Sequence, residues 1–256
     1  MALSRRDFVK LCSGTVAGFG VSQMFHPAIH EAFAQTLTGE RPPVFWVQGQ
    51  GCTGCSVTLL NSTHPSIADV LLKIISLEFH PTVMAAEGEG AYEHMMRVAE
   101  KFKGKFIFAV EGAVPVAHDG KCCVVAEADH HEVTMTEVTK VLAANAAAVL
   151  AVGTCAAYGG IPAGKGNETG AMGVSAFLKK EGIPAPVINI PGCPPHPDWI
   201  VGTIGLGLQA LATNTLGLLV KQGLDANGRP KAFYKNVHMN CPHLSAFEAG
   251  HMVKTM

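Results

Sequence analysis

Three short apolar runs in this chain each lead into a turn rich in glycine or proline that carries cysteine. The runs cover residues 44–48, 147–152 and 187–190. The cysteines in the turns that follow are Cys52, Cys55, Cys155 and Cys193. Because parallel strands bring their carboxyl ends to one edge of a sheet, turns of this kind can converge there. We therefore predict that the four thiols share one site at that edge.

The spacing of these cysteines favours one iron–sulfur cluster. A C-x-x-C pair with two distant single cysteines is a four-thiolate ligand set, and the flanking glycines let backbone N–H groups approach sulfur. Zinc prefers the same soft donors, but zinc ribbons pair two close knuckles, whereas these ligands come from three distant segments. Disulfides are less favoured. The chain has eight cysteines, and removal of a signal peptide that contains Cys12 would leave seven, which cannot all be paired.

Strand-like and helix-like segments alternate along the chain, which predicts an α/β fold. Further extended segments are expected at 74–79 and 106–110. Helices are expected at 56–61, with Ser56 as its N-cap, and at 67–75, 92–103, 133–144 and 175–180. Continuous apolar runs indicate strands covered on both faces. The pattern is typical of a flavodoxin-like, doubly wound parallel sheet.

The first loop, residues 49–56, leaves an alternative open. It is rich in glycine and opens a helix, so it could also cradle the phosphate of a flavin. No Gly-Lys-Ser/Thr sequence follows, so it is not a nucleotide-binding P-loop. Cysteines at two of its central positions favour a cluster. A thiolate zinc-binding or flavin-binding module of the same fold is the alternative function.

The N-terminus has the pattern of a twin-arginine signal peptide. The sequence Ser-Arg-Arg-Asp-Phe-Val-Lys at 4–10 precedes a weakly apolar stretch at 11–25 and a small-x-small cleavage site at 32–34. We expect residues 1–34 to direct export of the folded chain to the periplasm through the twin-arginine machinery. The mature protein would then begin near Gln35.

Composition limits the possible partners. The net charge of −1 gives no basic surface for nucleic acid, so no nucleic-acid partner is expected. Only 15% of residues are charged and 48% are hydrophobic. A poorly charged surface favours a large, permanent interface with another protein.

Five segments together resemble one family. They are residues 46–56, 76–84, 110–113, 153–162 and 191–199. In these segments the chain resembles the small subunit of nickel–iron hydrogenases, most closely the periplasmic nickel–iron–selenium type. The resemblance implies that Cys52, Cys55, Cys155 and Cys193 bind the proximal four-iron four-sulfur cluster. It also implies that the hydrogen-splitting nickel–iron site belongs to a separate large subunit, and that this chain relays electrons.

The resemblance extends to the C-terminal region. It implies that His238 and Cys241 are two of the four ligands of a distal cluster. Family members continue with a cysteine-rich segment, whereas this sequence has no cysteine after Cys241, and we expect it to be truncated. The expected domains are thus a cluster-binding domain at 35–225 and the incomplete start of an iron–sulfur region at 226–256. Further clusters are expected only if the native chain is longer.

Several residues outside the cysteine turns have roles of their own to be expected. The resemblance places Glu89 near the subunit interface, where it would move protons or form hydrogen bonds. It also implies an external electron acceptor, a cytochrome c or a membrane partner. The adjacent pair at 122–123 is expected inside a strand, and residues 130–132 in a solvated loop. His196 follows the last cysteine turn and would either order the groups around the cluster or pack on the surface.

Overall fold

The structure is a computed structural model that describes residues 41–63, 65–234 and 244–250. The expected signal peptide, His238 and Cys241 lie outside the described residues. Among the described residues, no helix combines the length and the apolar character needed to cross a bilayer.

Within the described part of the chain, five parallel strands form a sheet in the order β2-β1-β3-β6-β7. They are β1 (Pro43–Gln48), β2 (Ser76–Phe79), β3 (Ile107–Glu111), β6 (Ala148–Val152) and β7 (Val187–Ile190). The register sets Gln48 beside Glu111 and Glu111 beside Val152, so the central strands end level with one another. This is the flavodoxin-like strand order, which confirms the predicted fold class.

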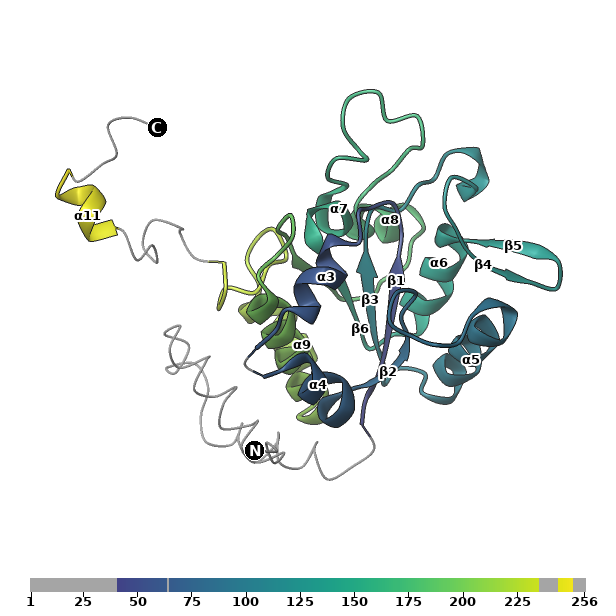
Figure 1. Cartoon of the computed structure of the whole chain (residues 1–256), viewed down its shortest axis with the longest axis horizontal. Helices are drawn as coiled ribbons and strands as arrows, with labels where there is room; N and C mark the ends of the chain where they lie inside the picture. The colour runs from purple at the N-terminus through teal and green to yellow at the C-terminus, as the bar shows by residue number, and fades with distance from the viewer. Residues whose placement is uncertain (1–40, 64, 235–243, 251–256) are drawn as a thin grey trace.

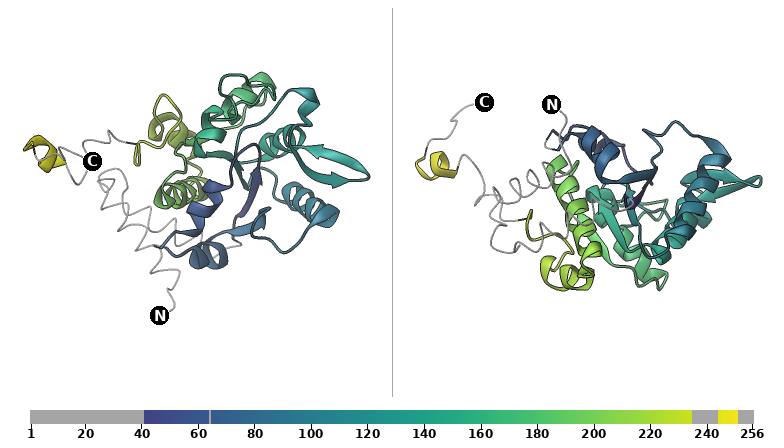
Figure 2. Two further views of the ribbon diagram at one scale, coloured as in Figure 1. Left: turned by 45° about the horizontal axis from the view of Figure 1, so that its top comes forward. Right: turned by 90° about the horizontal axis from the view of Figure 1, so that it is seen from below.

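Helices cover both faces of the sheet (Figure 1). One face carries α3 (Gly54–Leu60), α4 (Ile67–Asp69) with the π-helical turn η2 (Val70–Ile74), and α9 (Pro197–Ala212). The opposite face carries α5 (Gly88–Lys101), α6 (Met135–Asn145) and α8 (Val174–Lys180). Seen from two further directions, these helices flank the sheet as two outer layers (Figure 2).

Each strand sends alternate side chains into the two cores. In β1, Phe45 and Val47 pack with α5 and α6, while Val44 and Trp46 pack with α3 and α9. All four side chains are buried. Successive residues of a strand point to opposite faces, so a run buried on both sides must be apolar throughout. That requirement explains the continuous apolar runs in the sequence.

The structure describes several further elements outside the sheet and its two helical layers. They are α7 (Gly153–Tyr158), the short helix η3 (His118–Gly120), the hairpin of β4 (Val124–Ala128) and β5 (His131–Thr134), α10 (Leu216–Leu218), the π-helical turn η4 (Leu219–Gly223) and α11 (Leu244–Glu248).

Several local predictions were wrong. The helix expected at 133–144 begins only at Met135, because Thr134 ends β5 and forms a capping box with Glu137. The pair at 122–123 lies in the turn before β4, not inside a strand. Residues 130–132 are exposed as expected, but two of them belong to β5. Helix α9 was not predicted, because its glycines obscure the apolar period of a buried helix.

Candidate metal centre

The first cysteine pair lies where β1 leads into α3. Cys52 is exposed in the loop, whereas Cys55 is the second residue of the helix and is partly buried. Thr53 occupies the N-cap position with a left-handed φ of 64°, and its side chain caps nothing. Ser56 is therefore inside the helix and buried, and its prediction as the N-cap was wrong.

The capping group of α3 comes instead from the neighbouring strand. Glu111, the last residue of β3, accepts hydrogen bonds through Oε1 from the backbone N–H groups of Cys55 (2.9 Å) and Ser56 (3.1 Å). These N–H groups belong to the first turn of the helix, where backbone N–H groups have no carbonyl acceptor within the helix. A carboxylate there both satisfies the donors and complements the positive end of the helix. Glu111 therefore fixes the backbone that carries Cys55.

The second oxygen of this carboxylate holds a buried polar network. Oε2 accepts from the indole Nε1 of Trp46 (2.9 Å), the amide of Gln48 (3.2 Å) and the hydroxyl of Ser56. Glu111 and Ser56 are 3% and 1% exposed, so these bonds lie in a low-dielectric interior. Removing the carboxylate would leave several buried donors without a partner, which is costly.

His80 closes the network on its far side. Its Nδ1 accepts from the backbone N–H of Thr82 (3.1 Å), so Nε2 carries the proton and donates to Ser56 Oγ (3.2 Å). The ring stacks on Trp46 with centroids 5.4 Å apart. Burial lowers the pKa of His80, although Glu111 acts in the opposite direction. The neutral ring is the form that these contacts require.

The other two cysteines come from the next two strands. Cys155 lies in α7, a short helix where the sequence predicted only a turn, and Cys193 is exposed in the bend after β7. Thr154 N–H donates to Gly192 O (2.9 Å), and Gly192 N–H donates to Thr154 Oγ1 (3.1 Å). These two bonds join the segments of Cys155 and Cys193.

A further bond joins the first cysteine segment to the last one. From α3, the hydroxyl of Thr58 donates to the carbonyl of Pro195 at 3.2 Å. All three cysteine-bearing segments are therefore connected directly by hydrogen bonds at the carboxyl edge of the sheet. This edge is where doubly wound sheets bind their ligands.

The four thiols are close enough to influence one another's ionisation. Burial raises the pKa of Cys55, and the charges of Glu111, Cys155, Cys52 and Cys193 raise it further. Burial also raises the pKa of Cys155, with Cys193 and Cys52 adding to the effect, while the backbone N–H of Ile161 lowers it. A bound cation would favour the thiolates and displace their protons.

Glycines make room beside the sulfur atoms. A Cβ on Gly153 would lie 2.4 Å from Cys55 Sγ, and one on Gly160 would lie 2.7 Å from Cys155 Sγ. Within the described residues, no three side chains of the His, Cys, Asp and Glu types are arranged tightly enough for one metal ion. Sulfur ligands spaced too widely for one metal ion fit a multi-iron cluster better than one zinc ion with Zn–S bonds of about 2.3 Å.

Replacing Gly153 by alanine tests this packing. Gly153 has a φ of 86°, and a methyl group there would overlap the Cys55 thiol. We expect Gly153→Ala to lower cluster occupancy severalfold, measured as iron per protein. The strain of a left-handed alanine adds about 1–2 kcal/mol of destabilisation.

Gly182→Ala is the matched control. Gly182 also has a positive φ (69°), but nothing lies within 4 Å of the position of its Cβ. It should show the backbone strain alone and keep full iron content. Equal iron content in both variants would contradict a role for Gly153 in the site.

Two other predicted residues have defined contacts. Glu89 is exposed on α5, and its carboxylate accepts a hydrogen bond from the backbone N–H of Asp129 (2.8 Å) in the hairpin turn. His196 is the N-cap of α9, where its Nδ1 accepts from the N–H of Asp198 (3.3 Å). His196 therefore fixes the helix that follows the Cys193 bend.

The sequence did not reveal that Glu111, Ser56 and His80 act together. The available signal was the one carboxylate at the end of the otherwise apolar strand β3, since a buried charge requires partners. Its partners come from two other segments, β1 and α3, so no local pattern could identify them.

Comparisons with known proteins identify the family of this chain. The family model for the 20 kDa subunit of NADH ubiquinone oxidoreductase matches residues 52–206. The chain is 52% identical to the periplasmic NiFeSe hydrogenase small subunit of Desulfomicrobium baculatum, over 100% of this chain and 82% of that one. It is 36% identical to the hydrogenase-2 small chain of Escherichia coli K12, over 98% of this chain but only 63% of that one.

A solved structure shows the same likeness. The recombinant NiFeSe hydrogenase of Desulfovibrio vulgaris Hildenborough superposes with a TM-score of 0.80 at 66% identity, covering 86% of this chain and 79% of that one. The sequence identity, the near-complete coverage of this chain and the shared fold lead to one conclusion. The chain belongs to the family of small, electron-transferring subunits of heterodimeric nickel–iron hydrogenases.

Proposed function

We propose that Cys52, Cys55, Cys155 and Cys193 bind one four-iron four-sulfur cluster, the proximal cluster of the relay. The observation that carries this proposal is that hydrogen bonds join the three cysteine-bearing segments at one edge of the sheet, with Gly153 beside the Cys55 sulfur and Gly160 beside the Cys155 sulfur. A bound cluster of this kind supplies reversible one-electron transfer.

The residues of this chain position the cluster and leave hydrogen chemistry to the partner. Glu111 holds the backbone of Cys55, and the backbone N–H of Ile161 approaches the sulfur of Cys155. Cys52 and Cys193 are exposed, so the site opens to the surface of this chain. An open site suits electron exchange with a nickel–iron centre in the large subunit, since hydrogenase small subunits act in such heterodimers.

The remaining parts of the proposal concern export and the onward path of electrons. Relatives named as periplasmic hydrogenases support a periplasmic location. We propose that residues 1–34 direct export by the twin-arginine route. His238 and Cys241 would contribute to a distal cluster, and a cytochrome c or a membrane protein would accept the electrons. Glu89 would form hydrogen bonds or move protons near the large subunit.

Metal analysis of the heterodimer tests the cluster assignment. The complex is purified anaerobically, and iron, acid-labile sulfide and zinc are measured per heterodimer. We expect at least about four irons and four sulfides beyond the iron of the active site. Zinc without labile sulfide would contradict the cluster and favour the zinc-binding alternative, and bound flavin would favour the flavin-binding one.

A further inference from the structure

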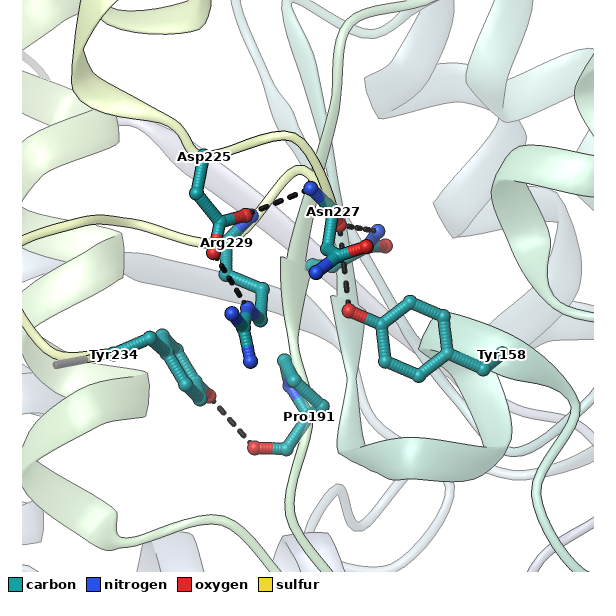
Figure 3. A network of polar contacts seen from close by, with 7 residues as sticks. Tyr158, Pro191, Asp225, Asn227, Arg229 and Tyr234 are labelled. Atoms are coloured by element: carbon teal, nitrogen blue, oxygen red, sulfur yellow. Dashed lines mark hydrogen bonds and ion pairs between the residues drawn. The ribbon is translucent and has the colours of Figure 1, made fainter. Parts of the chain in front are cut away.

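The bend that carries Cys193 is held by a tyrosine far along the chain. The hydroxyl of Tyr234 donates a hydrogen bond to the carbonyl of Pro191 at 2.7 Å (Figure 3). Pro191 lies two residues before Cys193, and 43 positions separate it from Tyr234. This bond therefore acts directly on the backbone that places the fourth thiol.

The ring of Tyr234 is itself fixed by its neighbours. The guanidinium of Arg229 lies 5.4 Å from its centroid, and the Trp199 ring lies 4.7 Å from it at a tilt of 58°. Arg229 Nε donates to Asp225 Oδ2 at 2.7 Å, and the backbone N–H of Arg229 donates to Asp225 Oδ1 at 2.9 Å. The loop from Asp225 to Arg229 is thus closed on itself and holds the guanidinium beside the ring.

The same loop contacts β7, which leads into the Cys193 bend, and α7, which carries Cys155. The carbonyl of Asn227 accepts from the side-chain amide of Asn189 in β7 (2.7 Å) and from the hydroxyl of Tyr158 at the end of α7 (3.3 Å). The carbonyl of Gly228 accepts from the backbone N–H of Asn189 at 2.8 Å. Figure 3 shows the Tyr158 hydroxyl directed at Asn227, and the Tyr234 hydroxyl directed at Pro191. The loop is anchored to the sheet and is a firm support for Tyr234.

We infer that Tyr234 is a positioning residue for the cluster, an inference that rests on the proposed cluster ligands. Its hydroxyl holds the Pro191 carbonyl and so restricts the Cys193 thiolate to the orientation that binds iron. Asp225 and Arg229 act through Tyr234 by holding its ring. A tyrosine that served only to pack the loop would need its ring but not its hydroxyl.

The test compares two variants that each lose one tyrosine hydroxyl. Tyr234→Phe removes the bond to the Cys193 bend and keeps the ring, whereas Tyr158→Phe removes a bond to the same loop that does not reach the bend. Both are made in the anaerobically purified heterodimer. The measurements are the electron paramagnetic resonance spectrum of the reduced proximal cluster and the rate of iron loss to a chelator.

We expect Tyr234→Phe to alter the cluster spectrum and to speed iron loss about fivefold, the factor that corresponds to one net hydrogen bond. Tyr158→Phe should change both measurements much less, because Asn189 still anchors the loop through two hydrogen bonds. If the Tyr234→Phe complex does not assemble, Arg229→Lys provides the test instead. This variant keeps the tyrosine hydroxyl but loosens its ring. It should therefore alter the cluster spectrum and the rate of iron loss in the same direction, by less than the fivefold expected for Tyr234→Phe.

The experiment distinguishes failure of the inference about Tyr234 from failure of the proposed cluster assignment. Wild-type spectrum and iron loss in Tyr234→Phe, or equal changes in Tyr158→Phe, would overturn the inference while leaving the cluster assignment intact. Absence of an iron–sulfur signal in the wild-type heterodimer would instead overturn the proposed function on which the inference rests.

Discussion

Replacing Cys193 by serine is expected to remove the proximal cluster and hydrogenase activity together. The thiolate is a soft ligand for iron, whereas a serine hydroxyl is a harder and far weaker acid. Cys193 is exposed in the bend after β7, so the substitution leaves the packing of the sheet intact. We expect hydrogen-driven reduction of a dye to fall more than about 100-fold, beyond the loss typical of residues outside the ligand set.

Cys123→Ser is the matched control for this substitution. Cys123 is partly buried before β4, and burial raises the pKa of its thiol, with Cys122 adding to the effect. Cys123 lies outside the three segments that carry the proposed ligands, so we expect it to behave as a small apolar side chain. The control should keep the cluster spectrum and activity. Normal turnover in Cys193→Ser, with the cluster signal retained, would contradict the assignment of this ligand.

The sequence predicted the sheet and the convergence of the cysteines because both depend on simple rules. Strands buried on both faces must be almost continuously apolar, as β1 is up to Gln48 and as β6 is throughout. The carboxyl ends of parallel strands meet at one edge, so residues that follow those runs come together. This rule alone predicts that Cys52 and Cys193 lie in one region of the fold.

The contacts that fix the site could not be predicted in this way. Glu111 reaches α3 across 55 positions of sequence, and Tyr234 reaches the Cys193 bend across 43. Each pair meets only because the register of the sheet and the packing of a loop bring it together. The prediction of Ser56 as an N-cap failed for the same reason, since a carboxylate from another strand supplies that cap.

Removing the carboxylate of Glu111 is expected to have the largest effect on stability among substitutions outside the cysteines. Glu111→Ala leaves the N–H groups at the start of α3 and the Trp46 indole without an acceptor in a buried site. Each buried donor left without an acceptor costs about 1–3 kcal/mol, so we expect the loss of several together to cost about 3–5 kcal/mol. Glu111→Gln keeps the volume but turns an N–H₂ group toward donors, so we expect about 2–3 kcal/mol. The readouts are thermal unfolding and iron content of the heterodimer.

Glu137→Gln separates the general cost of a lost helix cap from the specific effect on the cluster. Glu137 also accepts a backbone N–H at a helix N-terminus, that of Thr134 at 2.7 Å, but it is exposed and caps α6. Its loss should cost about 0.5–1 kcal/mol and leave iron content unchanged. Glu111→Gln should lower both stability and cluster occupancy, because the same oxygen that caps α3 holds the backbone N–H of Cys55. Full iron content in Glu111→Gln would show that this carboxylate stabilises the fold without positioning the ligand.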